Sequence, residues 1–228
     1  MGYLKTLIIN GSPRKRTHSQ MIEALEKGLT AADSEVTTKR VYDLDIKPCL
    51  GCSMTCMKKT PGICVHKDDM DSLLPLVSQS DLLVLATPVY LDAMTGPMKT
   101  FVDRLTPILE GRMEIRKGRA RHPLREGVKR GKMALLSSCG FPELETFDPL
   151  LAHVKAICRN LNREYVGAVL VTSGFVKRRK HWDKVLGMIE YAGANLIKDG
   201  KIPDDITSSI QSLVSRDELI NAANALYP

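Results

Sequence analysis

Residues 81–90 read DLLVLATPVY, a continuous apolar run that ends at Thr87, Pro88 and an aromatic residue. A short apolar run bounded by turn residues is typical of a strand buried on both faces, as in parallel sheets covered by helices. Similar runs occur at residues 3–10 (YLKTLIIN), 132–140 (KMALLSSCG) and 165–174 (YVGAVLVTSG). The segment 35–41 (EVTTKRV) alternates and is less apolar, which favours an outer strand.

Segments with helical spacing separate these strands. One carries Met21, Leu25 and Leu29 on one face, and another begins near Asp68. Further helices are expected after Gly96-Pro97, where proline suits the first turn, and over residues 147–162, 184–200 and 217–226. Five strands alternating with helices predict an α/β fold with a doubly wound parallel sheet. The length predicts a single domain over residues 1–228, with a cysteine-rich loop at 46–67 and a basic loop at 110–131 as excursions.

Composition excludes several function classes. The N-terminal apolar run is too short for a signal peptide, and no run reaches the roughly 20 apolar residues of a membrane span. We therefore expect a cytoplasmic protein with reduced thiols. The whole net charge of +7 comes from residues 111–132, which we interpret as a solvated surface loop, a subunit contact or a site for an anionic ligand. That segment has no aromatic residue for base stacking, so we expect no nucleic-acid partner.

Three strand ends carry polar or glycine-containing turns, and ligands of such sheets bind beyond the carboxyl ends of the strands. The first, NGSPRKRTHSQ, offers Ser12, Arg14, Thr17 and Ser19 before a helix, where free N–H groups and the helix dipole favour phosphate. It matches neither the P-loop nor the G-x-G-x-x-G pattern, and simple helix capping is the alternative. The second, Thr87 to Tyr90, could lie along a flat heterocycle, and the third, Ser138 to Phe141, allows close backbone approach at Gly140.

Five blocks together resemble the flavodoxin-like NAD(P)H-dependent FMN reductase family, especially its branch bordering the iron–sulfur flavoproteins. They are NGSPRKRTHSQ, CLGC…PGICVHKDDM, ATPVYLDAMTGPMKTFVDR, HPLR and SSCGFPE…FDPLLAHVKAICR, in family order from residue 5 to about residue 170. The resemblance implies a flavodoxin-like three-layer fold and bound FMN. The residues it would place at FMN are Ser12, Arg14, Thr17, His18 and Ser19 at the phosphate, Thr87, Pro88, Val89, Tyr90 and Leu91 beside the ring, and Ser138, Cys139 and Gly140 at its other edge.

The same resemblance implies an oxidoreductase that takes hydride from NAD(P)H. The acceptor would be a flavin, a quinone, a metal ion or a redox protein, and a homodimer or homotetramer is expected because neighbouring subunits often complete such pockets. No side chain stands out as a catalytic acid or base. Two alternatives stay open: an iron–sulfur flavoprotein that carries single electrons between protein partners, and a non-enzymatic adaptor that binds flavin or acts through its basic surface.

Four of six cysteines fall within CLGCSMTCMKKTPGIC, residues 49–64. Thiolates at Cys49, Cys52, Cys56 and Cys64 could hold a 4Fe–4S cluster or, with or without His66, zinc. The gap between the second and third cysteines has three residues, Ser53 to Thr55, where iron–sulfur flavoproteins characteristically have two. The alternatives are a working dithiol and a metal-free loop in which the thiols pack as small apolar side chains.

A few further residues receive structural interpretations. Cys158 is predicted to be core, and Cys139 a buried thiol beside the flavin site. Asp68 and Asp69 are interpreted as a helix N-terminal pair, and Trp182 as a half-buried anchor at a helix start. His122 in HPLR is either a loop histidine or a contact for a nicotinamide phosphate.

Overall fold

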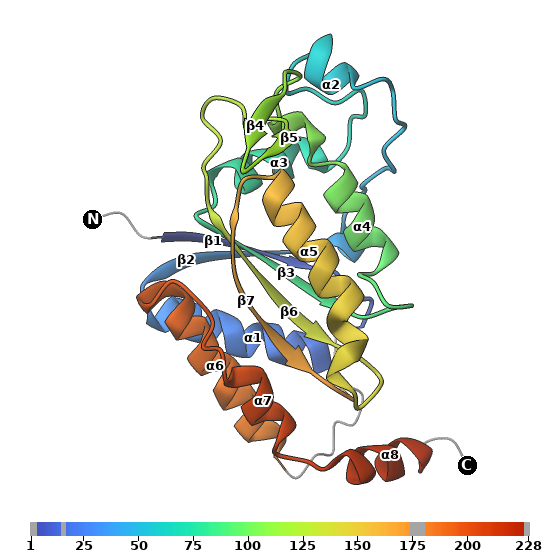
Figure 1. The fold of residues 1–228 in the computed structure, drawn as a ribbon, viewed down its shortest axis with the longest axis vertical. Coiled ribbons are helices and arrows are strands. Elements are labelled where there is room, and N and C mark those ends of the chain that lie inside the picture. The colour runs from blue at the N-terminus through green and yellow to red at the C-terminus, as the bar shows by residue number, and fades with distance from the viewer. Residues whose placement is uncertain (1–3, 15–16, 174–180, 226–228) are drawn as a thin grey trace.

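A computed structural model describes residues 4–14, 17–173 and 181–225, and its centre is a five-stranded parallel sheet (Figure 1). The strand order is β2-β1-β3-β6-β7. The strands are β1 (Leu4–Asn10), β2 (Ser34–Arg40), β3 (Leu82–Pro88), β6 (Lys132–Ser138) and β7 (Glu164–Val171). All five predicted strands are confirmed to within a few residues at their ends, including the outer position of β2. The order is that of flavodoxin-like folds, in which the chain reverses direction across the sheet between β1 and β3.

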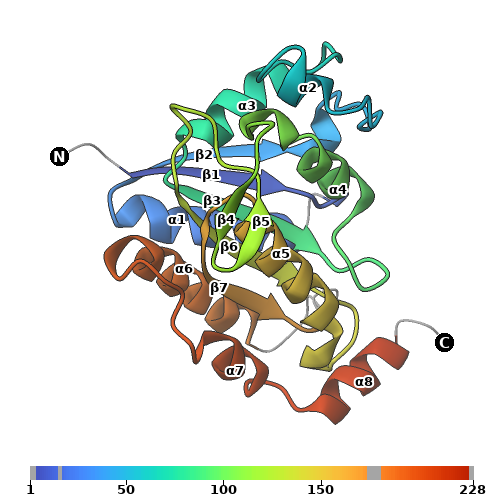
Figure 2. The ribbon, with the colours of Figure 1, turned by 45° about the horizontal axis from the view of Figure 1, so that its top comes forward.

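Helices cover both faces of the sheet, which gives three layers (Figures 1 and 2). One face carries α1 (Thr17–Ala31), α6 (Trp182–Lys198) and α7 (Ile206–Gln211), and the other carries α3 (Met70–Gln79), α4 (Gly96–Asp103) and α5 (Asp148–Asn160). Each face has its own apolar core. Leu25 of α1 belongs to the first core, and Leu73 of α3 and Phe101 of α4 belong to the second. The predicted apolar faces are therefore the buried ones.

The contact between α1 and α6 depends on two glycines. A Cβ at Gly28 would lie 1.9 Å from the carbonyl oxygen of Glu190, and one at Gly193 would lie 2.5 Å from that of Leu25. No side chain fits at either position without separating the helices. This close approach fixes the direction of α1, whose first turn lies at the edge of the sheet where β1 ends.

Several elements were not predicted. The segment predicted as a basic loop contains an antiparallel hairpin, β4 (Glu114–Arg116) and β5 (Arg119–Arg121), turning at Lys117 and Gly118, which have φ of 49° and 74°. The cysteine loop contains α2 (Thr55–Lys58), and short 3-10 turns lie at η1 (Val41–Asp43), η2 (Thr106–Ile108) and η3 (Leu144–Phe147). Each of these elements has three or four residues, which is too few to show a period in sequence.

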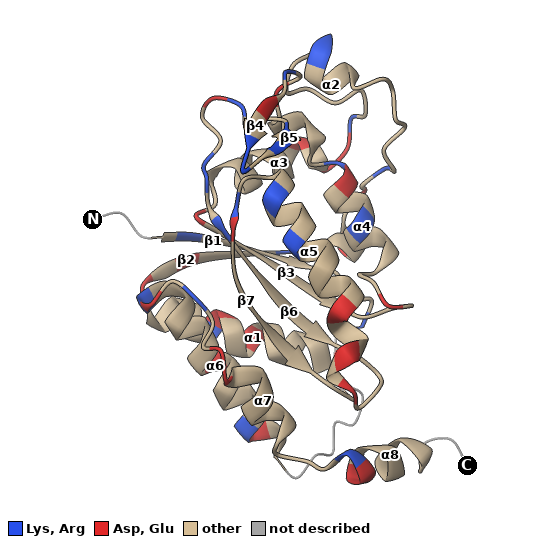
Figure 3. Cartoon of the chain, viewed as in Figure 1, with Lys and Arg blue, Asp and Glu red and all other residues tan. Residues whose placement is uncertain are grey.

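The chain ends in α8 (Arg216–Asn224), which has a capping box between Ser215 and Glu218 and agrees with the predicted C-terminal helix. Figure 3 shows Lys and Arg residues on α2 and on the β4–β5 hairpin, at the same end of the molecule. Within the described residues, no helix is both long enough and apolar enough to cross a bilayer.

Candidate functional site

The three predicted turns lie side by side at the carboxyl edge of the sheet. The strand register places Asn10 opposite Ala86, and Pro88 opposite Ser138. Gly11 N–H donates to Ala86 at 2.8 Å and Val89 N–H donates to Ser138 at 2.8 Å, so backbone hydrogen bonds continue past the strand ends. The predicted juxtaposition of the three turns is therefore confirmed.

The first turn has a fixed backbone. Ser12 N–H donates to Asn10 Oδ1 at 2.9 Å, and the buried Ser12 Oγ accepts from Arg14 N–H at 3.3 Å. The guanidinium of Arg40 on β2 donates to the carbonyls of Ser12 and Pro13, at 3.1 and 2.8 Å. Arg14 is exposed, and Lys15 and Arg16 lie outside the described residues. Arg40 on β2 therefore fixes the backbone of this turn, a role that the sequence alone did not indicate.

The first turn of α1 presents Thr17, His18 and Ser19. Thr17 and Ser19 are half-buried, and neither hydroxyl has a hydrogen-bond partner among the described residues. His18 is only 4% exposed, its Nδ1 lies 3.4 Å from Ser138 Oγ, and its buried Nε2 has no partner in the described chain. Burial lowers the pKa of His18 to about 4, and the nearby Ala86 carbonyl offsets only part of that effect. The imidazole is therefore neutral at pH 7.

The second turn is built around Thr87. This residue is fully buried, and its hydroxyl accepts from Thr95 N–H at 3.3 Å and donates to the Pro88 carbonyl at 3.1 Å. Thr95 in turn donates through Oγ1 to the carbonyl of Gly11 at 2.8 Å, which joins the second turn to the first. Thr87 thus positions the loop, and the surfaces left for a ligand are those of Pro88, Val89 and Tyr90.

The chain reverses at Tyr90 to Ala93. Tyr90 N–H donates to Ala93 at 2.9 Å, and Leu91 and Asp92 both have positive φ, of 45° and 63°. Tyr90 is 46% exposed and Leu91 is completely exposed. Leu91 is unfavourable for the isolated chain in two ways, because its apolar side chain is exposed to water and its backbone is left-handed. Such strained positions often occur at ligand or partner contacts.

The third turn lies beside the second. Ser138 is half-buried and Gly140 exposed, while Cys139 is 5% exposed and its thiol donates to the Phe141 carbonyl at 3.1 Å. Phe141 is 64% exposed on the same rim. The predicted buried state of Cys139 is confirmed. Cys158 is core as predicted, and burial raises its thiol pKa to about 11.

The cysteine loop is closed at its base by an ion pair that sequence analysis missed. Arg104 donates to Asp68 at 2.6 and 3.0 Å, and both side chains are essentially inaccessible. Arg104 also donates to the Lys47 carbonyl at 2.6 Å, and Asp68 accepts from Lys47 N–H at 3.0 Å. Asp68 accepts from Met70 N–H as well, at 3.1 Å, so it does lie at a helix start as predicted. Its main partner, however, is a buried guanidinium and not the helix dipole.

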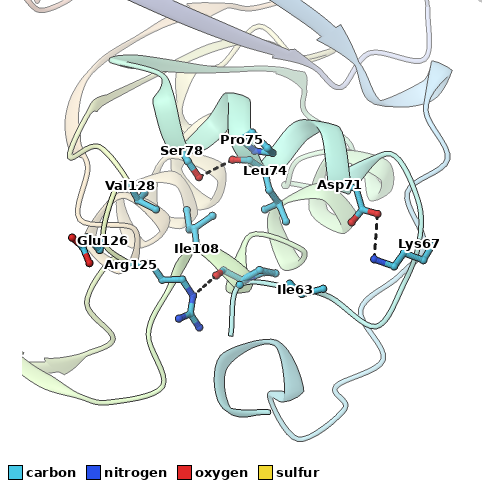
Figure 4. Close-up of a pocket in the computed structure, with 12 residues that line it drawn as sticks. Ile63, Lys67, Asp71, Leu74, Pro75, Ser78, Ile108, Arg125, Glu126 and Val128 are labelled. Carbon is cyan, nitrogen blue, oxygen red and sulfur yellow. Dashed lines mark hydrogen bonds and ion pairs between the residues drawn. The ribbon is translucent and has the colours of Figure 1, made fainter. Parts of the chain in front are cut away.

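A second arginine holds the far side of the loop. Arg125, from the HPLR block, donates to the carbonyls of Pro107, Cys56 and Met57 at 2.8, 3.3 and 3.4 Å. Beside it lies a pocket of about 420 Å³ between the cysteine loop, α3 and residues 125–128 (Figure 4). Its walls are mostly apolar, including Ile63, Leu74 and Ile108. This pocket lies apart from the three strand-end turns.

The four loop cysteines differ in exposure. Cys49 is exposed, Cys52 and Cys64 are intermediate, and Cys56 is buried. Burial raises the pKa of Cys56, and the charges of Cys64, Cys52 and Cys49 add to the increase. His66 instead contacts the Pro48 carbonyl through Nε2 at 3.0 Å. His122 contacts the Arg112 carbonyl, and Trp182 is half-buried at the start of α6, with its N–H donated to Gln20 at 3.2 Å.

Comparison with known proteins decides the family. The sequence profile described as NADPH-dependent FMN reductase matches residues 4–141, more than half of the chain and all three turns. The chain belongs to this family.

Relatives of this chain include proteins named iron–sulfur flavoproteins. One from Archaeoglobus fulgidus is 37% identical over 141 residues, which are 61% of this chain and 58% of the relative. One from Methanocaldococcus jannaschii is 36% identical over 121 residues, 51% of this chain and 58% of the relative. The chain therefore matches little more than half the length of these relatives. Among solved structures, the FMN-dependent NADH-azoreductase of Bacillus anthracis in complex with FMN has a TM-score of 0.62 at 14% identity, covering 85% of this chain and 99% of that one. That likeness shows the shared fold.

The three turns of this FMN reductase family member fit a phosphorylated flavin in their chemistry. The buried Nε2 of His18 lacks a partner, and two free hydroxyls flank it at a helix N-terminus. Orphaned buried polar atoms are rare unless a ligand or water completes them. A Cβ at Gly11 would lie 2.8 Å from Met98 Cε and 3.0 Å from Met98 Cβ, so a larger residue there would require the Met98 side chain to shift.

The cysteine loop supplies the right kind of donor for a 4Fe–4S cluster, but its thiols do not lie in the positions that a cluster needs. Four thiols lie on one loop with a fixed base. Within the described residues, no three His, Cys, Asp or Glu side chains are close enough to share a metal ion. Ser53 and Met54, in the lengthened gap between Cys52 and Cys56, both have positive φ, of 50° and 57°, and Cys56 lies within α2. Closing the thiols around a cluster would require this part of the loop to change conformation.

Proposed function

We propose that the chain binds FMN at the three strand-end turns, takes hydride from NAD(P)H and passes the electrons to an acceptor. When bound, FMN would supply the hydride and electron-transfer chemistry. The chain's own residues would hold the cofactor and set its surroundings. The observation that carries this proposal is the partnerless Nε2 of His18 at the first turn of α1, between the half-buried Thr17 and Ser19.

Each turn has a distinct part in the proposal. Ser12, Arg14, Thr17, His18 and Ser19 would hold the phosphate, because they combine hydroxyl donors, a cation and the positive end of a helix. Val89 and Tyr90 would lie along the ring, with Thr87 fixing their loop. Ser138 and Gly140 would border its other edge. No described acid or base is placed to move a proton during hydride transfer, so we assign no catalytic side chain.

Exposed apolar side chains at the rim favour a partner surface there. Tyr90, Leu91 and Phe141 are all about half exposed or more, at the mouth of the proposed site. In the proposed assembly, a second copy of the chain covers them and completes the pocket, as is expected of the family. A single species of monomer mass in sedimentation equilibrium at micromolar concentration would contradict this part.

The visible spectrum of the purified protein tests the function. We expect flavin absorbance that bleaches on adding NADPH without oxygen. Ser12→Ala combined with Ser19→Ala should lower FMN affinity, because each charge-assisted donor contributes about 1.5–3 kcal/mol. The matched control is Ser208→Ala combined with Ser212→Ala. Ser208 lies in α7 and Ser212 directly follows it, and both exposed hydroxyls donate only to nearby backbone carbonyls. Unchanged FMN affinity in the first double variant would contradict the phosphate site.

An iron–sulfur flavoprotein is the second candidate, favoured by the four thiols on the cysteine loop and by the names of the relatives from Archaeoglobus fulgidus and Methanocaldococcus jannaschii. In this case the protein would carry single electrons between protein partners. Iron and acid-labile sulfide are to be measured after anaerobic purification, with a Cys49→Ser, Cys52→Ser variant as control. About four of each per chain, lost in the variant, would support it. Flavin without iron would contradict this second candidate and leave the FMN-dependent oxidoreductase as the proposed function.

A further inference from the structure

His18 occupies an unusual position at the proposed phosphate site. It is 4% exposed on the first turn of α1, yet its Nε2 has no hydrogen-bond partner in the described chain. Its Nδ1 is 3.4 Å from Ser138 Oγ, which belongs to a different turn of the same site. The ring therefore connects the phosphate turn to the third turn, and one of its nitrogens remains available.

The described elements around His18 carry ionisable groups, but none of their charges is a cause of its lowered pKa. Helix α1 packs against α6, β2, β3 and β6, and the neutral Ala86 carbonyl of β3 lies near the ring. Among the described residues, the ionisable groups at the site's end of these elements and in the preceding turn are Arg14, Lys39, Arg40, Cys139, Asp183 and Lys184. None of them is a cause of the low pKa of His18, which arises from burial, partly offset by the Ala86 carbonyl. Arg40 is engaged with the Ser12 and Pro13 carbonyls and with Asp43, and the Cys139 thiol with the Phe141 carbonyl.

A phosphate dianion would change this balance. A neutral imidazole that lacks a counter-charge gains a strong one when two negative charges arrive at the same helix turn. In a buried site, that interaction can raise a histidine pKa by several units. Nε2 would then carry the proton and donate to the anion in a charge-assisted hydrogen bond.

We infer that His18 takes up a proton when the phosphate of FMN binds, so that loading of the cofactor is coupled to pH. The inference rests on the proposed FMN site. Between the pKa values of His18 in the free and bound protein, FMN affinity should fall about tenfold for each unit of rising pH. Asparagine at position 18 could still contact Ser138 but could not titrate.

Isothermal titration with FMN at pH 7 tests the coupling directly. Measurements in PIPES and in imidazole, which have different ionisation enthalpies, give the number of protons taken up per FMN. We expect uptake approaching one proton in the wild-type chain and none in His18→Asn, with affinity weakened about tenfold in the variant. His153→Asn is the matched control, because His153 lies on α5 at the opposite face, and it should behave as wild type.

Riboflavin separates this coupling from other sources of protons. It carries the same ring without the phosphate, so its binding to the wild-type chain should show no proton uptake. Because it uses only the wild-type chain, this comparison still tests the coupling if His18→Asn does not fold. Uptake that persists in His18→Asn or with riboflavin would overturn the inference, as would FMN binding with equal heats in both buffers after correction. Absence of any FMN binding would instead overturn the proposed function.

Discussion

Leu91 illustrates how a single residue can conflict with its local structure. It and Asp92 are the central residues of a two-residue turn with positive φ, a conformation that strongly prefers Asn-Gly. Its side chain is completely exposed, so packing within this chain does not compensate. The sequence YLDA gives no turn signal, which is why this reversal could not be predicted.

Leu91→Gly should therefore stabilise the FMN-free monomer, measured at protein concentrations too low for the proposed second copy to cover Leu91. The left-handed conformation costs a non-glycine residue about 1–2 kcal/mol, and part of this is offset by the greater freedom of glycine when unfolded. We expect the free energy of unfolding in urea to rise by about 1 kcal/mol. Leu109→Gly, at a partly buried residue with φ of −103°, is the control and should destabilise. A less stable Leu91→Gly variant would mean that the side chain packs against something in solution.

His18 also gives a testable dependence of stability on pH. Its pKa is about 4 when folded and about 6.5 when unfolded, so the unfolded chain binds the proton more tightly. Stability from this group is complete above pH 6.5 and is lost as pH falls towards 4. Between pH 7 and pH 5, the FMN-free protein should lose about 2 kcal/mol of unfolding free energy by this route. The difference between wild type and His18→Asn in urea denaturation at the two pH values measures it. A difference that does not change with pH would contradict the buried neutral state.

At the scale of elements, apolar periodicity predicted the sheet and its covering helices because each element has one buried face. Met70, Leu73 and Val77 follow helical spacing and are all inaccessible in α3. Arg104 in the segment FVDRLT could not be treated in this way. An arginine in a helical segment is expected to be exposed, and its burial depends on Asp68, which lies 36 residues earlier in the chain. Pairing of this kind leaves no local pattern.

The Asp68–Arg104 pair should matter far more than its surface counterparts. Removing one partner of a buried ion pair leaves the other uncompensated, which costs about 3–5 kcal/mol. Asp68→Asn should lose that much in chemical denaturation, whereas Asp103→Asn, which breaks the exposed Lys99–Asp103 pair, should lose about 0.5 kcal/mol or less. Burial alone would raise the pKa of Asp68, but hydrogen bonds from Arg104 and two backbone N–H groups lower it overall. Its contribution should therefore persist down to about pH 4 and vanish below that. Equal costs for the two variants would show that the pair is solvated.

For the whole molecule, strand order explains why the site could be predicted better than its details. Polar turns after three parallel strands must lie at one edge, so Ser12, Thr87 and Ser138 could be grouped from sequence. The roles of these side chains within the group depend on contacts across the sheet. Thr87 is occupied with Thr95, and His18 is buried by residues as distant as Ser138, 120 positions away. Such contacts depend on how the layers pack and are not encoded locally.

Binding at that edge should stabilise the entire domain. A ligand that binds only the folded state adds about 2.7 kcal/mol at a concentration of 100 times its Kd. For a chain of 228 residues this corresponds to a rise in Tm of about 5–10 °C with FMN. Riboflavin at the same concentration should give a much smaller rise, because the first turn of α1 would gain no anion. The Ser12→Ala, Ser19→Ala variant should bring the FMN shift close to the riboflavin shift in differential scanning calorimetry. Equal shifts for both ligands in the wild-type chain would mean that the βα turn at Ser12 does not bind phosphate.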